Sequence, residues 1–228
     1  MSDWQQLPFD EESFRGTARL FPVPGLVLFP HVMQTLHVFE ERYRAMMEDA
    51  VAGDELIAMA TLEPGWETDY AGRPPLSKHA CLGRILTHHR FPDGRFNLML
   101  LGVRRLRLVG EVDPPQAFRQ AHVEIVPECG PANPEPVRQR LLTALQAGLP
   151  EAVLNSEQMS EVLSRELPLK VLTDLLGFAL PLEEAVKRSL LADPDAASRA
   201  ETLIKSLAAS TASGDGENRW SPPAFSEN

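Results

Sequence analysis

The sequence predicts an α+β protein in which a mostly antiparallel β-barrel with one inserted helix precedes a small C-terminal helical bundle. Three observations predict this fold class. From residue 17 to about residue 126, short apolar runs alternate with proline and glycine, as in small all-β domains. One stretch of this half, residues 40–51, has apolar residues at helical spacing instead. From Gly130 onward the helical spacing continues through several short segments.

The β half is expected to contain about seven short strands. Asp93-Gly94 lies between two apolar runs and predicts a tight hairpin turn, because such turns need positive φ. Pro114-Pro115 predicts another turn, and residues 63–79 predict a long irregular loop of the kind that is often functional. The strands are expected to come from eight short β-like segments, at residues 19–23, 26–29, 33–38, 55–62, 81–91, 96–103, 106–109 and 117–126.

The inserted helix and the bundle follow from periodicity and capping residues. In residues 40–51 one helical face holds Tyr43, Met46, Met47 and Ala50, and Gly53 is expected to end the helix in the left-handed conformation. Five further helices are expected, beginning near residues 134, 156, 168, 182 and 194. The predicted organisation is a flexible N-terminus (1–16), a β domain (17–128), a helical subdomain (129–209) and a disordered tail (210–228).

Composition argues against several classes of protein. The 228 residues carry a formal net charge of −10, which disfavours nucleic acid because phosphate repels an acidic partner. No apolar run approaches the ~18–20 residues of a membrane span, and the acidic residues 1–14 lack the basic-then-apolar order expected of a signal peptide. The cysteines, Cys81 and Cys129, are far apart, so we expect reduced thiols and a cytoplasmic protein.

One segment departs from this acidic character. Between Ala80 and Gly110 six arginines stand against one acidic residue, Asp93: Arg84, Arg90, Arg95, Arg104, Arg105 and Arg107. This arginine stripe could bind a polyanion such as RNA, or it could simply solvate the outer face of a sheet. Neighbouring residues of a strand point to opposite faces, so Arg104 and Arg105 cannot both face one ligand.

Two blocks of sequence resemble the amino-terminal substrate-binding domain of Lon proteases. The first, residues 19–62, contains VLFP at 27–30, LHVFE at 36–40 and RYR at 42–44. The second, residues 81–108, contains DGRFN at 93–97 and GVRR at 102–105. The resemblance implies a PUA-like β-barrel followed by a helical subdomain, and a module that holds protein or peptide. Two residues depart from the family pattern, since His31 replaces a glycine and Thr35 replaces a proline, which puts the conformation of their loop in doubt.

The residues provide no support for catalysis. No Gly-x4-Gly-Lys-Ser/Thr phosphate loop occurs, no Gly-x-Ser-x-Gly elbow occurs, and no cofactor is expected. His37 with Glu40 and Glu41 resembles a partial metal site, but His37 falls in a strand and a second zincin histidine is missing. His88 and His89 are adjacent in a strand and cannot chelate together. We therefore expect a free-standing, non-enzymatic protein with neither a catalytic residue nor a metal.

The expected partners are unfolded or exposed protein segments, and a protease that the module assists. Candidate peptide-binding residues are apolar and lie on irregular segments: Phe29, Val32 and Met33 in the first loop, and Trp66 and Tyr70 in the long loop. These side chains could equally cover the ends of the barrel. RNA binding through Arg84, Arg90, Arg104, Arg105 and Arg107 is the alternative function.

Overall fold

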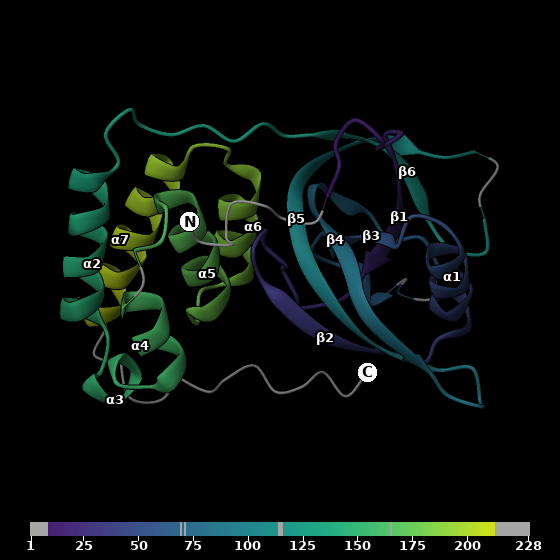
Figure 1. The fold of residues 1–228 in the computed structure, drawn as a ribbon, viewed down its shortest axis with the longest axis horizontal. Helices are drawn as coiled ribbons and strands as arrows, with labels where there is room; N and C mark the ends of the chain where they lie inside the picture. The colour runs from purple at the N-terminus through teal and green to yellow at the C-terminus, as the bar shows by residue number, and fades with distance from the viewer. Residues whose placement is uncertain (1–8, 69, 71, 114–115, 165, 213–228) are drawn as a thin grey trace. The chain divides into compact units, whose positions relative to one another are not determined.

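The computed structural model describes residues 9–68, 70, 72–113, 116–164 and 166–212. They form two compact units, a β unit that ends at Val126 and a helical unit that begins at Pro127 (Figure 1). The expectations for residues 1–8, for the turn at Pro114-Pro115 and for residues 213–228 lie outside the described residues. Within that part of the chain, no helix is both long and apolar enough to cross a bilayer.

The β unit is a six-stranded sheet whose strand order is β2-β5-β4-β3-β1-β6. β5 also pairs with β6, so the five strands β5, β4, β3, β1 and β6 form a closed ring of pairings, and β2 lies outside that ring. Every pair is antiparallel except β1 with β3. The strands are β1 (Thr17–Pro22), β2 (Met33–Val38), β3 (Leu56–Leu62), β4 (Leu76–Arg90), β5 (Phe96–Glu111) and β6 (Gln120–Ile125).

Two strand predictions were wrong. Residues 26–29 form no strand, because Pro24, Gly25 at φ +70° and Pro30 keep the chain irregular there, although Val27, Leu28 and Phe29 are buried. Residues 96–103 and 106–109 are one strand, β5, since the ladder with β4 continues across Arg104 and Arg105. The long loop is also shorter than expected, because β4 already begins at Leu76.

The inserted helix, α1 (Glu41–Ala52), buries Tyr43, Met46, Met47 and Ala50, as its spacing predicted. Its end differs from the prediction, because Gly53 has φ −115° and is not left-handed. A Cβ at Gly53 would lie 3.0 Å from Nη2 of Arg19, whose guanidinium pairs with Asp49 and Asp54. A side chain at position 53 would therefore be in tight contact with the Arg19 guanidinium.

Two other glycines have roles that the backbone geometry explains. Gly94 adopts φ +86° in the β4–β5 turn, where its N–H donates to the Phe91 carbonyl at 2.9 Å. Gly102 on β5 allows another segment to approach, since a Cβ there would stand 2.0 Å from the carbonyl oxygen of Phe29. The first irregular loop thus packs directly on the backbone of β5.

The helical unit contains six helices among the described residues, one more than expected: α2 (Glu135–Gly148), α3 (Glu151–Leu154), α4 (Glu157–Ser164), α5 (Leu169–Ala179), α6 (Glu184–Ala192) and α7 (Ala196–Ala212). The short α3 carries too few residues to show a period. Ser156, and not Asn155, caps α4, because its Oγ accepts the Met159 N–H at 3.4 Å. α7 packs against α2 and α5.

A buried arginine ties the helical unit together. Arg199 on α7 is fully buried, and its guanidinium donates to Thr173 Oγ1 at 3.1 Å and to the Asp193 carbonyl at 3.0 Å. It also lies 3.3 Å from Glu128 and 3.6 Å from Asp174.

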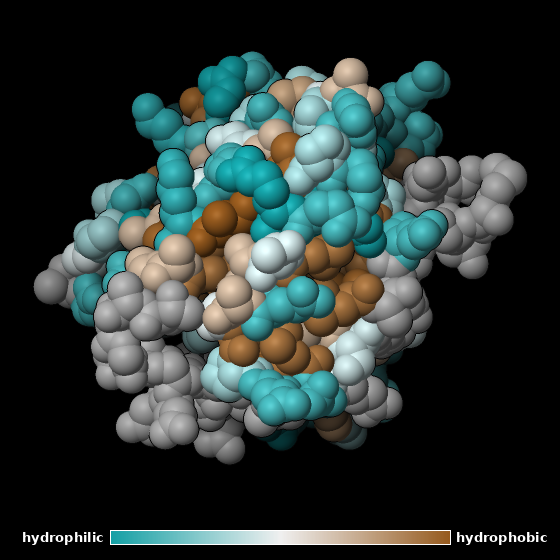
Figure 2. Space-filling view, turned by 90° about the vertical axis from the view of Figure 1, so that its left-hand side faces the viewer, coloured by the Kyte–Doolittle hydropathy of each residue, from teal (hydrophilic) through white to brown (hydrophobic). Residues whose placement is uncertain are grey.

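Several leucines of this unit are only half-buried, and Figure 2 shows hydrophobic residues gathered between hydrophilic ones on the side that it draws.

Candidate functional site

A shallow aromatic hollow lies where the long loop meets the end of β2 and the start of α1. Trp66 and Tyr70 of the loop pack edge to face, with ring centroids 5.5 Å apart. The hollow has a predominantly apolar lining of Phe21, Val23, Pro24, Leu36, His37, Val38, Phe39, Glu40, Tyr43 and Tyr70. Its free volume is only about 20 Å³, so the hollow is suited to a small apolar side chain of a partner and not to a larger ligand.

Arg42 holds one side of this aromatic hollow in place. Its guanidinium lies 4.6 Å from the ring centroid of Tyr43 and 5.0 Å from that of Tyr70, so that both faces of the cation are covered. It also donates to Glu40 at 3.0 Å and to the Tyr70 carbonyl at 3.3 Å. Tyr70 in turn donates its hydroxyl to Glu40 at 2.9 Å. Burial, together with this bond to a carboxylate, raises the pKa of Tyr70 above its usual value.

A second arginine fastens the far end of the long loop. Arg119 on the approach to β6 is buried and donates to the Pro74 carbonyl at 2.7 Å. Its guanidinium and that of Arg73 both pair with Glu111. Burial opposes ionisation of Glu111, but the hydrogen bonds from these two arginines outweigh it and lower the pKa of the carboxyl. The loop is thus fixed at both ends before any ligand arrives, which reduces the entropy lost on binding.

An aromatic cluster at the end of β2 adjoins the hollow. His37 Nδ1 donates a hydrogen bond to Asn97 Oδ1 at 2.6 Å, and the His37 ring lies 6.2 Å from both Phe39 and Phe91. His89 packs edge to face on Phe91 at 4.8 Å. Across the residues with defined positions, no three His, Cys, Asp or Glu side chains gather as metal ligands would. The neighbours of His37 are therefore two aromatic rings and the side-chain amide of Asn97.

The structure separates the five predicted peptide-binding residues into three groups. Phe29 and Val32 are buried in the core, at 0% and 4% exposure, and so leave the candidate surface. They were expected at the surface because their segment is irregular, but Gly102 lets that segment pack inward. Trp66 and Tyr70 are brought together at the aromatic hollow. Met33 is 61% exposed and begins β2, about 20 Å along the strand from Phe39 at its other end.

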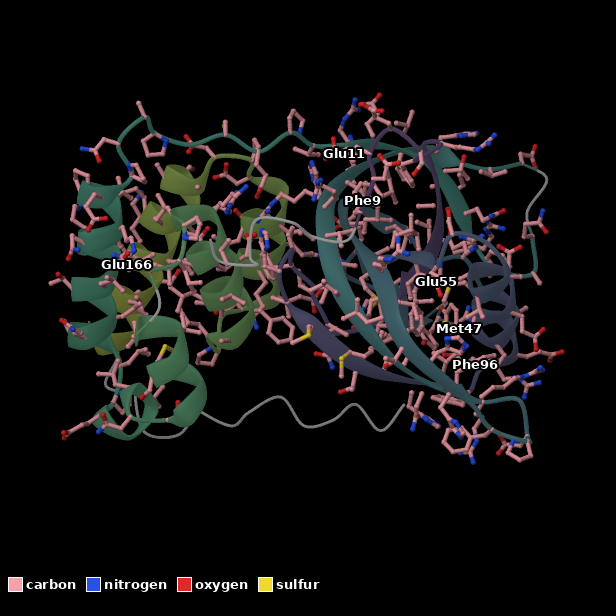
Figure 3. All side chains as sticks on the ribbon, in the orientation of Figure 1. Phe9, Glu11, Met47, Glu55, Phe96 and Glu166 are labelled. Carbon is pink, nitrogen blue, oxygen red and sulfur yellow. The ribbon has the colours of Figure 1, made fainter. Side chains whose placement is uncertain are left out.

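The arginine stripe is neutralised by partners within the chain. Ion pairs join Arg84 to Glu55, Arg90 to Glu48, Arg95 to Asp93, Arg104 to Glu11, and Arg107 to Glu124. Figure 3 labels two of these carboxylates, Glu11 and Glu55. The sequence count missed them because all but Asp93 come from outside the stripe. Arg105 is 1% exposed and faces the interior, whereas Arg104 is only half-buried, as the alternation of a strand requires.

Sequence reasoning missed Phe39 and Phe91, which help to form the aromatic cluster. Phe39 is 41% exposed although it directly follows a buried strand residue, Val38. The position of Phe39, a large apolar residue between a predicted strand and the start of a predicted helix, was a signal in the sequence that could have indicated an exposed aromatic side chain. The β2 register, which pairs Val38 with Phe96, could not be read from the sequence.

Comparison with known proteins identifies the family. Residues 17–209 match the family model of the ATP-dependent protease La (LON) substrate-binding domain. The chain belongs to this family. The matched residues include every strand of the β unit and extend to residue 209 in the last helix of the helical unit.

Relatives of this Lon domain are much longer proteases. Lon protease 2 of Desulfotalea psychrophila is 30% identical over 193 residues, which cover 82% of this chain and 24% of the relative. Lon protease of Heliobacterium modesticaldum is 25% identical over 206 residues, covering 87% and 25% respectively. The chain therefore spans about a quarter of the length of the curated relatives it matches.

Solved structures show the same fold. The N-terminal domain of Mycobacterium avium complex Lon protease aligns with a TM-score of 0.64 at 22% identity, covering 84% of this chain and 98% of that one. A Lon N-terminal domain protein from Xanthomonas campestris aligns with a TM-score of 0.60 at 24% identity, covering 83% and 97%. The matches lie in the substrate-binding domain and not in a protease domain.

The structure also explains one departure of this Lon domain from the family pattern. His31 adopts φ +67°, a conformation that glycine reaches most readily, so the backbone at this position keeps the shape a glycine would have. Its side chain is buried, and its N–H donates to the Gly102 carbonyl at 2.8 Å. Thr35, the second departure, is exposed in the middle of β2.

Proposed function

We propose that this protein is a non-catalytic module that recognises unfolded or exposed protein segments and assists proteolysis. The observation that carries the proposal is the family match over residues 17–209, which covers a substrate-binding domain and no catalytic domain. The preformed aromatic hollow beside β2 supplies a surface suited to apolar side chains. The closed ring of strand pairings supports a PUA-like barrel as the frame of this surface.

RNA binding is less well supported than protein binding. A polyanion site needs cations that are free to replace counterions around phosphates. In the arginine stripe the exposed guanidiniums already face carboxylates, and the whole chain is acidic, with a formal net charge of −10. An RNA ligand would therefore have to displace five ion pairs against a repulsive field.

The proposal is tested with one protein in two states. Reduced, carboxymethylated α-lactalbumin serves as an unfolded client and native α-lactalbumin as its folded counterpart, each titrated by fluorescence anisotropy. We expect binding of the unfolded form only. Trp66→Ala should weaken it at least fivefold, about 1 kcal/mol, because Tyr70, which lines the hollow, loses the ring that packs against it. The matched control Val109→Ala removes an exposed apolar residue elsewhere on the β unit and should change the Kd less than twofold.

Enzymatic activity provides a second check. The purified protein should neither hydrolyse ATP nor degrade casein, since the sequence has no phosphate loop and no candidate nucleophile elbow. Multiple ATP turnovers by clean protein, or equal binding of native and unfolded α-lactalbumin, would contradict the proposal.

A further inference from the structure

The strand β2 is paired along one edge among the described residues. It pairs with β5 from Met33↔Leu101 to Val38↔Phe96 without a register shift. β5 pairs with β4 on its other edge, and β6 pairs with the distal half of β5 that β2 does not reach. β2 therefore ends the strand order, and its second edge pairs with no strand among the described residues.

The hydrogen bonds at the start of β2 determine which residues face that second edge. Gly102 donates its N–H to the Val32 carbonyl at 2.9 Å, so this pair is hydrogen-bonded. Bonded and non-bonded pairs alternate along an antiparallel ladder. Gln34, Leu36 and Val38 thus bond to β5, while the other three residues, Met33, Thr35 and His37, turn their N–H and C=O groups outward. The Gln34 side-chain amide, which donates to the Thr35 carbonyl at 2.8 Å, agrees with this assignment.

The same three residues also present side chains to solvent. Met33 and Thr35 are exposed and His37 is half-buried, whereas Leu36 and Val38 are buried. Proteins usually protect such an edge with lysine, proline or an inward-pointing charge. From Val32 to Phe39 the sequence VMQTLHVF contains no proline, lysine, arginine or carboxylate, in a chain with a formal net charge of −10.

Thr35 adds to this absence of protection. Thr35 is the departure at which the family pattern has proline, a residue without an N–H group. With threonine, the centre of the outer edge has a backbone N–H donor, and its carbonyl accepts from the Gln34 side-chain amide, which a partner strand would replace. The outward groups of β2 can therefore form a continuous ladder with a partner strand.

We propose that β2 binds an extended, uncharged segment of a client as an added strand, with an apolar side chain of that segment in the aromatic hollow. This inference rests on the proposed function and specifies how the client is held. The edge carries no charge, so strongly acidic or basic segments gain nothing from it, while Met33 and Phe39 offer apolar contacts at its two ends. Six residues of strand, about 20 Å, set the length of the bound segment.

Backbone pairing is tested with peptides that differ only in their amide nitrogens. The probe is a fluorescein-labelled octapeptide of alternating valine and threonine, titrated by anisotropy. Two variants carry N-methyl groups on either the odd or the even residues, which removes alternate N–H donors and leaves the side chains unchanged. Because a strand turns only alternate N–H groups to one neighbour, we expect one variant to lose at least tenfold in affinity and the other less than threefold.

Variants of the protein test the same proposal by placing a proline or a lysine, the residues that usually block strand addition, on the outer edge of β2. Thr35→Pro removes an N–H that does not bond to β5, so the variant should fold, and it should weaken peptide binding at least tenfold. Met33→Lys places a charge on the same edge without changing the backbone and should weaken binding at least threefold. Val109→Lys, the matched control on β5, should leave peptide binding within twofold. Far-UV circular dichroism and Tm verify that each variant is folded.

The outcomes distinguish this inference from the proposed function. Strand addition is wrong if unfolded α-lactalbumin binds but the octapeptide does not, or if neither N-methyl variant loses affinity. It is also wrong if Met33→Lys and a folded Thr35→Pro bind like the wild type. In these cases the proposed function stands with another surface. If unfolded α-lactalbumin does not bind at all, the proposed function itself fails.

Discussion

The arginine stripe on β4 and β5 and the neutral strand β2 lie side by side in the same sheet, yet they differ in what they leave unpaired. The stripe concentrates charge in the sequence, but its exposed guanidiniums pair with carboxylates of the same chain. β2 has no charged side chain, but its second edge has backbone groups without a strand partner among the described residues. The arginine stripe, although conspicuous in the sequence, is therefore already paired with carboxylates of the same chain. β2 has an ordinary composition, and it is the surface that we propose binds a client.

The largest expected effect comes from separating β2 and its loop from β5. Gly102→Ala places a Cβ about 2.0 Å from the Phe29 carbonyl oxygen, so the loop must move, and we expect a loss of about 3 kcal/mol or more in the free energy of unfolding. Gly110→Ala, on the same strand with no atom within 4 Å, should change it by less than about 1 kcal/mol. Urea unfolding measures both. Similar losses in the two variants would mean that the close approach does not hold β2 in place.

The next largest effect is expected at Arg105, the buried arginine of the stripe, compared with an arginine of the stripe that is exposed to solvent. Arg105→Ala removes a buried side chain and should cost roughly 2–4 kcal/mol through the cavity and lost contacts. Arg107→Ala breaks an exposed pair with Glu124 and should cost less than about 1 kcal/mol. Chemical denaturation compares the variants. A large cost at Arg107 would show that the surface pairs stabilise the sheet more than exposed pairs usually do.

A smaller effect is expected at the turn that joins β4 to β5. Gly94→Val forces a β-branched residue to φ +86° and brings its Cβ to 3.3 Å from the Arg44 guanidinium, so stability should fall by about 1–2 kcal/mol. Gly94→Asn should cost less, because asparagine tolerates positive φ. Thermal unfolding of both variants tests the turn. An unchanged Tm for the valine variant would show that the turn conformation is not required.

The smallest effect is expected from salt. If the client binds through β2 and the aromatic hollow, its Kd should change less than threefold between 50 and 300 mM KCl, since apolar contacts are hardly screened. Binding through the stripe would instead fall steeply as phosphate counterions are released. Titration of unfolded α-lactalbumin and of poly(U) at both salt concentrations distinguishes the surfaces. Tight, salt-sensitive binding of poly(U) would show that the arginine stripe, and not β2, is the binding surface.

Much of the fold was predictable because local patterns and tertiary structure agree. β2 has the predicted bounds, and the four residues predicted for the buried face of α1 are buried. The errors arose where the local pattern was weak or misleading. Gly53 has φ −115° and not the left-handed conformation expected of a glycine that ends a helix, and α3 has only four residues, too few for a periodic signal.

The candidate site was less predictable, because exposure depends on the sheet register. Phe29 and Val32 belong to an irregular segment, and only the close approach at Gly102 explains their burial. The partners of the stripe come from as far away as Glu11, which is 93 residues before Arg104 in the chain. In contrast, the contact between Trp66 and Tyr70 joins residues of one loop, so sequence reasoning could place them together.

The ring of pairings also has a consequence for the order of folding during synthesis. β1 pairs with β6, which leaves about a hundred residues between the two partners. As the ribosome releases the chain from its N-terminus, β1 has one open edge until residue 125 has emerged. Long-range closure of this kind is slow and exposes strand edges for a time. Nascent chains should therefore gain protease resistance in a single late step, after β6 leaves the exit tunnel.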